Sequence, residues 1–314
     1  MAVSPAVAWL LESAEPGIRY QARRDLLGVD EPAAQSSILN GPMVRALLAG
    51  QEADGGFGRN PYQKWTGVHW RLVSLVELGV PPGDPRLLAA GDRVVRWLTG
   101  PAHRRTIRAV NGLTRVCASM EGNALAACCR IGLAEDPRTE LLARSLVEWQ
   151  WPDGGWNCDR NASGRRSSFH ESHAPAWGLY EYWRATGADW ARSAFERTAE
   201  LFLSHRVFRT STGDDVINRR WLALRYPPYW HYDVLQGLVV LARLGHAGDP
   251  RCADALDILE ERRQPDGRWQ PSGYWWRGPE STSGPPEVVD WGRSGPSEMM
   301  TLNALRVLKA AGRG

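Results

Sequence analysis

Side chains that can do chemistry gather at the starts of the more apolar helical stretches of this 314-residue chain. Imidazole and carboxyl groups transfer protons near neutral pH, and thiolates and imidazoles bind metal ions. A carboxylate at a helix start also serves as a cap, because it accepts hydrogen bonds from unpaired N–H groups. Capping does not require four histidines and a cysteine, so we expect the whole set to line a site. Its members are His69, Cys117, Glu121, His170, His173, His231, Asp233 and Glu298.

His231 and Asp233, with His173, are the candidate catalytic residues. Pro227 and Pro228 bar an earlier helix start, so His231 and Asp233 are expected in the first turn of the buried helix that follows. That end of a helix is positive and stabilises an anionic Asp. Asp233 is therefore expected to act as a base, to orient a histidine or to stabilise a substrate cation.

Five further residues are expected to line a substrate pocket beside this centre. The aromatic faces among them would stabilise a cationic substrate. The five are His69, Glu121, Trp177, Trp230 and Glu298.

The elements that must position these residues repeat along the chain. Three segments carry nearly the same turn, QEADGGF (51–57), QWPDGGW (150–156) and QPDGRW (264–269), and three helix starts carry Asp-Pro-Arg, at 84–86, 136–138 and 249–251. Six apolar stretches end at a glycine, at positions 28, 79, 132, 187, 245 and 312, which are spaced 51, 53, 55, 58 and 67 residues apart. Asp and Pro favour helix starts and glycine favours helix ends. A period this long, with two helices per unit, predicts stacked helical hairpins.

The hairpins are expected to close into a ring. The first helix of each unit is amphipathic and belongs outside, whereas the second is apolar on most faces and belongs inside. An open array needs polar capping repeats, but the last unit, at 303–308, is as apolar as the middle ones. We therefore predict an all-α fold, an α/α toroid of six hairpins with inner and outer helix rings, as a single domain over 1–314. The turn tryptophans Trp156 and Trp269 should pack between neighbouring hairpins, and function is expected at the mouth where the inner helices begin.

The composition limits the cellular compartment and the classes of partner that we expect for this protein. The net charge is +3 with signs mixed throughout, so no nucleic-acid partner is expected. No run approaches the ~20 apolar residues of a membrane span, and Glu12 interrupts the apolar start, so we expect neither a transmembrane segment nor a secretory signal. Five cysteines, an odd number, favour the reduced cytoplasm. Peripheral contact with a membrane surface stays open.

The Gln-Asp-Gly-Gly-aromatic turns resemble the glutamine–tryptophan repeats of squalene–hopene and oxidosqualene cyclases, and the glycine–aromatic turns of protein prenyltransferase β subunits. The resemblance covers essentially the whole chain. The segments 156–159, 167–170 and 230–235 are also similar to bacterial proteins described as squalene-cyclase-like or prenyltransferase-like. The resemblance implies the α/α toroid and an apolar, isoprenoid substrate in a central cavity.

The resemblance to prenyltransferases also implies a zinc site. In that family an Asp and a Cys at one inner helix and a His at the next hold zinc. Cys117 matches the Cys and His170 the His, whereas Arg115 stands where the Asp belongs. Cys158 is the expected replacement ligand, with His173 as the alternative, because zinc accepts Cys and His in tetrahedral sets. No other cofactor is expected.

Cyclases that begin by protonation carry an Asp-x-Asp-Asp motif at an inner helix, and only Asp233 of that motif stands in the comparable segment here. Three functions follow as alternatives. The first is a cyclase-like or prenyltransferase-like enzyme acting on an isoprenoid. The second is a zinc-dependent enzyme with a non-terpenoid substrate, and the third is a non-enzymatic binding scaffold.

Overall fold

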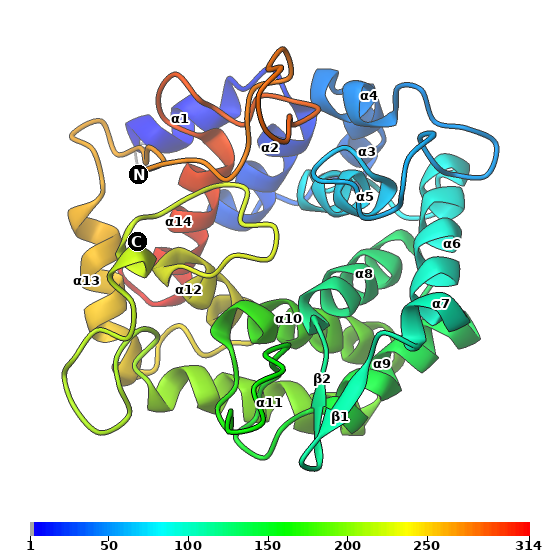
Figure 1. The fold of residues 1–314 in the computed structure, drawn as a ribbon. Coiled ribbons are helices and arrows are strands. Elements are labelled where there is room, and N and C mark those ends of the chain that lie inside the picture. Colours follow the sequence, from blue (N-terminus) through cyan, green and yellow to red (C-terminus); the bar gives the residue numbers. More distant parts are fainter. Residues whose placement is uncertain (1–2) are drawn as a thin grey trace.

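The chain forms two concentric layers of helices in the computed structural model, which describes residues 3–314 (Figure 1). The inner helices are α2 (Pro16–Gln21) with its π-helical continuation η1 (Ala22–Leu27), α5 (Val68–Glu77), α8 (Ala118–Ile131), α10 (Phe169–Thr186), α12 (Val234–Arg243) and α14 (Glu298–Ala310). The outer helices are α1 (Pro5–Leu11), α4 (Pro42–Leu48), α6 (Pro85–Thr99), α9 (Pro137–Trp149), α11 (Asp189–Ser204) and α13 (Ala253–Glu261). Outer and inner helices therefore alternate along the chain.

Short elements fill the connections. They are the helix α3 (Pro32–Gln35), the 3-10 helices η2 (Ser36–Asn40), η3 (Arg219–Leu222) and η4 (Pro250–Cys252), and the helix α7 (Pro101–Arg104). The strands β1 (Arg108–Val110) and β2 (Leu113–Arg115) pair antiparallel, with Arg108 opposite Arg115. Among the described residues this two-stranded hairpin is the only sheet.

The inner helices close into a ring (Figure 1). Consecutive inner helices pack side by side from α5 through α8, α10 and α12 to α14, and α14 packs against α2 and η1. At that last seam Arg306 Nε donates to Asp25 Oδ2 at 2.8 Å. Gln21 Nε2 donates to the Glu77 carbonyl at 3.1 Å and joins α2 to α5. The predicted all-α toroid of six hairpins is confirmed.

The repeated helix starts and ends have the predicted local structure. Asp84, Asp136 and Asp249 cap α6, α9 and η4, and each carboxylate accepts from the backbone N–H two residues on, with Pro between. The six closing glycines all have positive φ, between 71° and 100°. Other residues resist that conformation, so these positions end the helices.

The turn tryptophans fasten each outer helix to its inner partner. Trp156 is fully buried, its indole N–H donates to the Leu146 carbonyl of α9 at 2.8 Å, and its backbone N–H donates to Ser172 Oγ of α10 at 3.0 Å. Trp269 repeats both contacts, with the Leu259 carbonyl of α13 at 2.8 Å and with Thr301 Oγ1 of α14 at 3.0 Å. These tryptophans are buried, as a structural role requires, but their hydrogen bonds join the two helices of one hairpin and not neighbouring hairpins as predicted.

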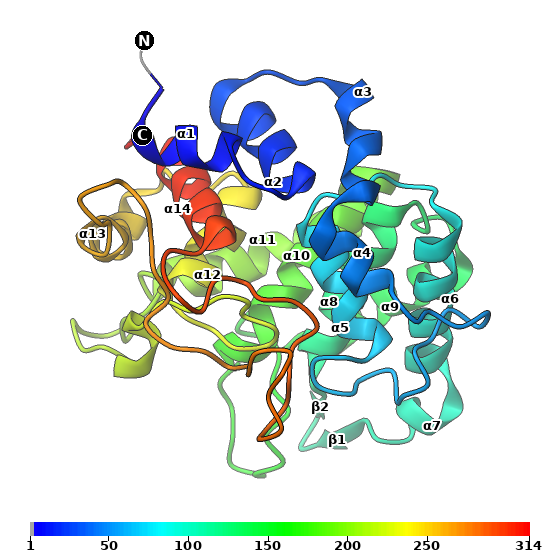
Figure 2. The ribbon, with the colours of Figure 1, turned by 90° about the horizontal axis from the view of Figure 1, so that it is seen from above.

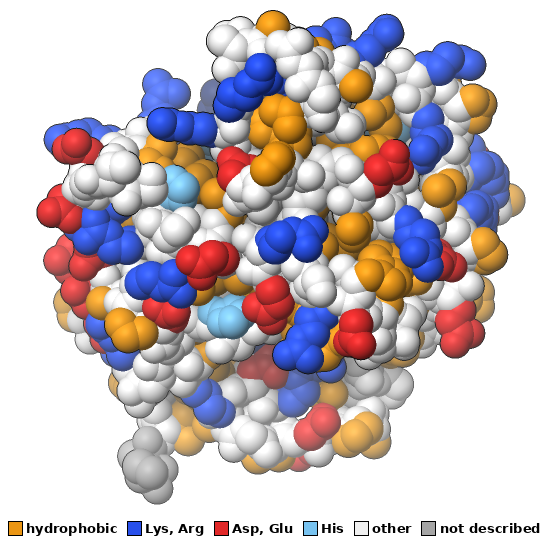
Figure 3. Space-filling view, turned by 90° about the horizontal axis from the view of Figure 1, so that it is seen from below, with side chains coloured by type: hydrophobic (Ala, Val, Ile, Leu, Met, Phe, Trp, Pro, Cys, Tyr) orange, Lys and Arg blue, Asp and Glu red, His pale blue; other side chains and the backbone are white. Residues whose placement is uncertain are grey.

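The two mouths of the ring differ. The long connections from outer to inner helices, including β1 and β2, gather on the face where the inner helices begin (Figures 1 and 2). The opposite face holds the inner-helix ends. A side of the ring shows basic and acidic side chains intermixed, with hydrophobic ones scattered between them (Figure 3). Within residues 3–314, every helix is too short or too polar to span a bilayer.

Candidate functional site

A cavity in the ring opens where the inner helices end. It has a volume of about 530 Å³, and we call it the outer chamber. Every inner helix contributes residues from its C-terminal part. This cavity lies at the end of the ring opposite the mouth where function was expected, and the long connections gather at that other mouth (Figure 2).

The wall of the outer chamber is largely charged. Its apolar surface comes from Val76, Trp177, Tyr180, Val239 and Val307. Six cations and three carboxylates make up most of the remainder: Arg24, Arg130, Arg184, Arg243, Arg306, Lys309, Asp25, Glu77 and Glu181. Trp177 is the only tryptophan within residues 3–314 that lines this chamber.

A smaller inner chamber of about 40 Å³ continues the cavity into the ring. The two chambers share Glu77, Trp177, Val239 and Arg243 in their walls. Its other lining residues are mainly aromatic and polar: Val73, Ser74, Asn123, His173, Tyr226, Pro227, Pro228, Tyr229, Gln236 and Val240. The Gln236 side-chain nitrogen is buried without a hydrogen-bond partner among the described residues.

His173 is the predicted catalytic residue that lines the inner chamber. It lies in the second turn of α10 with 5% of its surface exposed. Burial, reinforced by the nearby His170, lowers the pKa of His173 to about 3. The imidazole is therefore neutral at pH 7. Its Nε2 lies 3.5 Å from the Trp230 carbonyl oxygen.

Asp233 lies apart from both chambers and acts as a helix cap. Oδ1 accepts from the Gln236 backbone N–H at 3.1 Å, and Oδ2 accepts from the Arg225 backbone N–H at 2.9 Å. Only 2% of Asp233 is exposed, and burial raises its pKa to about 7. The expectation that Asp233 opens to a cavity is wrong for these chambers, because both of its oxygens are used to hold backbone.

His231 precedes α12 instead of lying in its first turn, because the helix begins at Val234 behind the Asp233 cap. Its ring is sandwiched between Trp230 and Trp275, with centroids 3.8 Å away on each side. Burial lowers its pKa to about 3. The rings of His231 and His170 lie 6.4 Å apart, and neither residue lines a chamber.

The other predicted pocket residues also lie outside the chambers, Trp177 excepted. Glu298 accepts from Ser13 Oγ at 2.9 Å at the start of α14. Glu121 is buried, with its Oε1 2.6 Å from His103 Nε2. His69 is 1% exposed and packs edge-on against Trp70. One face of Trp177 is already covered by Arg243, whose guanidinium lies 4.4 Å from the ring centroid, so that face is not free for a substrate cation.

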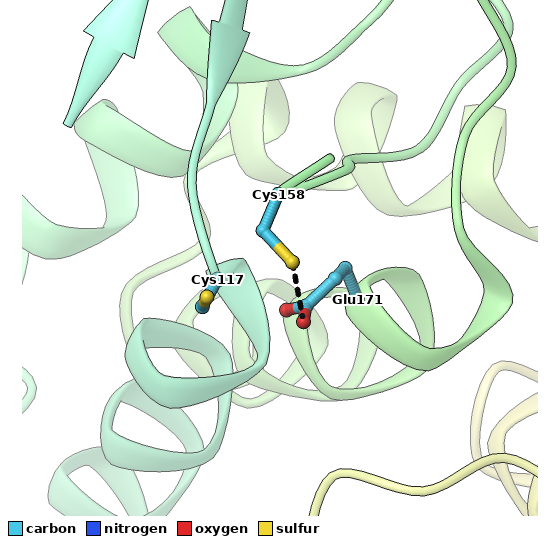
Figure 4. Close-up of side chains that lie close together, drawn as sticks. All are labelled: Cys117, Cys158 and Glu171. Carbon is cyan, nitrogen blue, oxygen red and sulfur yellow. Dashed lines mark hydrogen bonds between the residues drawn. The ribbon is translucent and has the colours of Figure 1, made fainter. Parts of the chain in front are cut away.

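Two of the predicted metal ligands converge with a third residue that the sequence did not single out. Potential ligand atoms of Cys117, Cys158 and Glu171 all lie within 4.8 Å of one another (Figure 4). Cys158 Sγ lies 3.5 Å from Glu171 Oε1. Hydrogen bonding with Cys158 lowers the pKa of Cys117, and burial raises the pKa of Glu171. We call these three residues the Cys–Glu cluster.

His170 does not belong to the cluster. Its Nδ1 accepts from the Tyr232 backbone N–H at 2.8 Å and so faces α12, while the next residue, Glu171, faces α8. Glu171 Oε2 also accepts from the Ser119 backbone N–H at 2.9 Å, which fixes the carboxylate. Arg115 does not enter the ligand set either, because its guanidinium lies 4.4 Å from the Trp151 ring centroid and donates to the Gly164 carbonyl.

The donor set fits a zinc ion. Zinc binds thiolate sulfur and carboxylate oxygen, and ligand atoms of a tetrahedral site lie about 3.3–3.8 Å apart. The three donor atoms lie within 4.8 Å of one another, so they would have to move closer together to hold an ion. A fourth position would remain open beside Cys117, which reaches the surface.

A buried acid pair near the inner chamber was also missed from the sequence. Tyr229 lines the chamber and its hydroxyl donates to Glu287. Glu287 is 2% exposed, and burial raises its pKa to about 7. Glu287 lies in an irregular loop between Pro286 and Val288, where no periodic pattern marks it.

No family model matches the chain, and no curated protein does. Several solved structures are similar to it, among them the following two. A protein from Actinoplanes has 17% sequence identity and a TM-score of 0.46, over 98% of both chains. The type II terpene cyclase MstE from Scytonema, in complex with its product merosterolic acid A, has 13% identity and a TM-score of 0.31, over 88% of this chain and 97% of that one. Function therefore has to be argued from this chain's own residues.

Proposed function

We propose that this protein is a small-molecule enzyme, cyclase-like or prenyltransferase-like, that acts on an isoprenoid substrate in the cavity of the ring. The cavity itself carries the proposal. A chamber of about 530 Å³ leads directly to a narrower one that contains a buried histidine. Ligand pockets of about 300–1,000 Å³ with a few convergent polar groups are typical of small-molecule sites.

The residues of the two chambers would contact different parts of a substrate. Val76, Val239 and Val307 offer apolar surface to hydrocarbon in the outer chamber. His173 presents a neutral imidazole, which is the basic form, at the wall of the inner chamber. A neutral imidazole there can hold a polar substrate group by a hydrogen bond, whereas its lowered pKa disfavours the uptake of a proton. The open chamber and the intermixed surface charges of Figure 3 favour an enzyme over a binding scaffold.

The test uses geraniol, a neutral C10 isoprenoid, as the probe. We expect it to bind the native protein in calorimetric titration. Val239→Trp fills the wall shared by the two chambers and is expected to abolish binding. Leu141→Trp, at an exposed position of α9, is the matched control and should bind as the native protein does. Absence of geraniol binding, or equal binding by both variants, would contradict the proposal.

A zinc-dependent enzyme is the second candidate, favoured by the Cys–Glu cluster. Cys117, Cys158 and Glu171 would hold the ion, and zinc would supply a Lewis acid or an activated thiolate or water at its open position. The buried Glu121–His103 pair lies close enough for the Glu121 charge to influence Cys117, and it would tune the site.

Elemental analysis tests this candidate without an activity assay. The native protein is expected to carry about one zinc per chain, and its cobalt form should show sulfur-to-cobalt charge-transfer absorption. Cys117→Ser and Cys158→Ser should each lose the metal and the absorption. Cys129→Ser, outside the cluster, is the control. A native protein that neither contains zinc nor takes up cobalt would exclude the candidate.

A further inference from the structure

The cations of the outer chamber come from one recurring position. Five inner helices carry a basic residue in the last turn, namely Arg24, Arg130, Arg184, Arg243 and Lys309. Because the inner helices run in the same direction around the ring, these side chains meet at one mouth. Arg306 of α14 joins them from one turn deeper.

Helix capping explains one of these residues. A basic side chain near a helix end can donate to the last carbonyls and offset the negative end of the dipole. Lys309 does so, because its ammonium donates to the Asp25 and Leu26 carbonyls at 2.8 and 3.0 Å. Within the described residues, Arg130, Arg184, Arg243 and Arg306 make no hydrogen bond to a backbone carbonyl. Capping therefore leaves these four guanidinium groups unexplained.

Internal ion pairs do not balance the chamber. Asp25 is shared by Arg24 and Arg306, and Glu77 accepts from Arg243 at 2.8 and 3.0 Å. The other carboxylate of the wall, Glu181, lies 3.6 Å from Arg130 and also accepts from the Trp177 indole N–H at 3.0 Å.

Arg184 has no carboxylate partner in the part of the chain that the structure describes. Six cations against three carboxylates leave an excess of three positive charges around one cavity. Low-dielectric walls concentrate such a field and raise the local concentration of anions.

The guanidinium groups of two of these arginines are held in place by hydrogen bonds. Arg243 is anchored by Glu77 and lies flat enough to contact the Trp177 ring at 4.4 Å. Arg306 is anchored by Asp25 and by the Asn303 and Gln21 side-chain oxygens, at 3.0 and 2.8 Å. Burial lowers the pKa of Arg306, and the charge of Arg243 lowers it further. Among the described residues Arg243 donates through Nη2 alone, so its other N–H groups can meet phosphate or carboxylate oxygens, whereas Arg306 has one N–H left for an anion.

We propose that the outer chamber binds the anionic head group, phosphate or carboxylate, of an amphipathic substrate, with Arg243 and Arg306 as the main contacts and Arg130 and Arg184 as supporting cations. The hydrocarbon part lies on Val76, Val239 and Val307, which share the chamber with these arginines. This inference rests on the proposed function, because it names the substrate class of the same cavity.

Three C10 probes that differ only in the head group test it: geranyl monophosphate, geranic acid and geraniol. The native protein is expected to bind at least one of the two anions about tenfold more tightly than geraniol, as expected for one charge-assisted interaction. The anion that gains the affinity identifies the head group. Raising the salt concentration should weaken binding of that anion and leave geraniol binding unchanged.

Arginine variants show which side chains of the outer chamber contact the anionic head group. Arg243→Gln is expected to weaken anion binding about tenfold and to leave geraniol binding unchanged. Arg184→Gln, which breaks no ion pair, keeps the test valid if Arg243→Gln fails to fold, and it should weaken anion binding about threefold. Arg192→Gln on the outside of α11 removes the same charge and is the matched control.

The outcomes separate the two proposals. Equal binding of all three probes, or equal losses in Arg184→Gln and Arg192→Gln, would overturn the anion inference and leave the proposed function standing. If no probe binds the native protein, the proposed function itself fails.

Discussion

Burial decides what the Asp233 carboxylate does at the start of α12. A surface carboxylate at a helix start is stabilised as an anion. Asp233 also accepts hydrogen bonds from two backbone N–H groups, which favour the anion. Its burial outweighs them and raises its pKa to about 7. In the unfolded chain the pKa of an Asp is about 3.9. The folded protein therefore keeps this proton between about pH 4 and 7, where the unfolded chain has lost it.

The prediction at this scale concerns pH and stability. A raised pKa contributes stability that is complete below about pH 4 and is lost as the pH rises through about 7. Asp233→Asn should flatten that decline in urea unfolding followed from pH 4 to 8, and Asp233→Ala should cost about 0.5–2 kcal/mol through loss of the cap. Glu148→Gln, on the exposed side of α9, is the control. Loss of substrate binding by Asp233→Asn, without any change in stability, would instead support the catalytic role predicted from the sequence.

Neighbouring residues on a helix show why the site was only partly predictable. His170 and Glu171 are adjacent at the start of α10, but successive residues point about 100° apart around a helix. Which of the two faces Cys117 depends on the rotation of α10 against α8. Packing sets that rotation, and the sequence does not display it. The arginines, by contrast, left a readable signal, since Arg130, Arg184 and Arg243 each stand two or three residues before a closing glycine.

At the scale of the element, the turns hold outer and inner helices together. Trp156 and Trp269 make the same pair of hydrogen bonds in two different hairpins. The sequence repeat therefore encodes a repeated contact, and this is why the hairpins could be predicted. The connections after these turns have unequal lengths and no shared sequence pattern. Their position over one mouth of the ring could therefore not be predicted.

Trp156→Ala is expected to lower the free energy of unfolding by about 3–5 kcal/mol, because it leaves a large cavity and frees the Leu146 carbonyl. Urea unfolding followed by far-ultraviolet circular dichroism measures this, since tryptophan fluorescence would change with the substitution itself. Trp190→Ala, half-buried on the outer side of α11, should cost clearly less. Equal costs would mean that Trp156 does not fasten the hairpin.

At the scale of the whole molecule, closure gives every hairpin two neighbours. Close backbone contacts mark distant seams of the ring. A β-carbon on Gly17 would lie 2.1 Å from the Leu78 carbonyl oxygen, at the α2–α5 seam. One on Gly122 would lie 2.2 Å from the Pro175 nitrogen, at the α8–α10 seam. Neither backbone can yield without moving a helix.

Gly17→Ala and Gly122→Ala should therefore each lower the free energy of unfolding by about 1–3 kcal/mol. In each variant the whole ring should still unfold in a single transition, at a lower temperature. Differential scanning calorimetry measures the transition. Gly248→Ala, where an added β-carbon meets no atom within 4 Å, is the control and should be neutral. Two separate transitions in either seam variant would show that the ring unfolds in parts, as an open array does.

The seam between the last hairpin and the first has a consequence for chain order. α1 packs against α14, so the first and last helices of the ring, from which the two ends of the chain continue, lie side by side (Figures 1 and 2). A short linker between those ends, with a new opening in another connection, would give a circularly permuted chain with the same neighbours throughout. Such a permutant could carry new termini at the covered mouth, so that a fused label would leave the open chamber unobstructed.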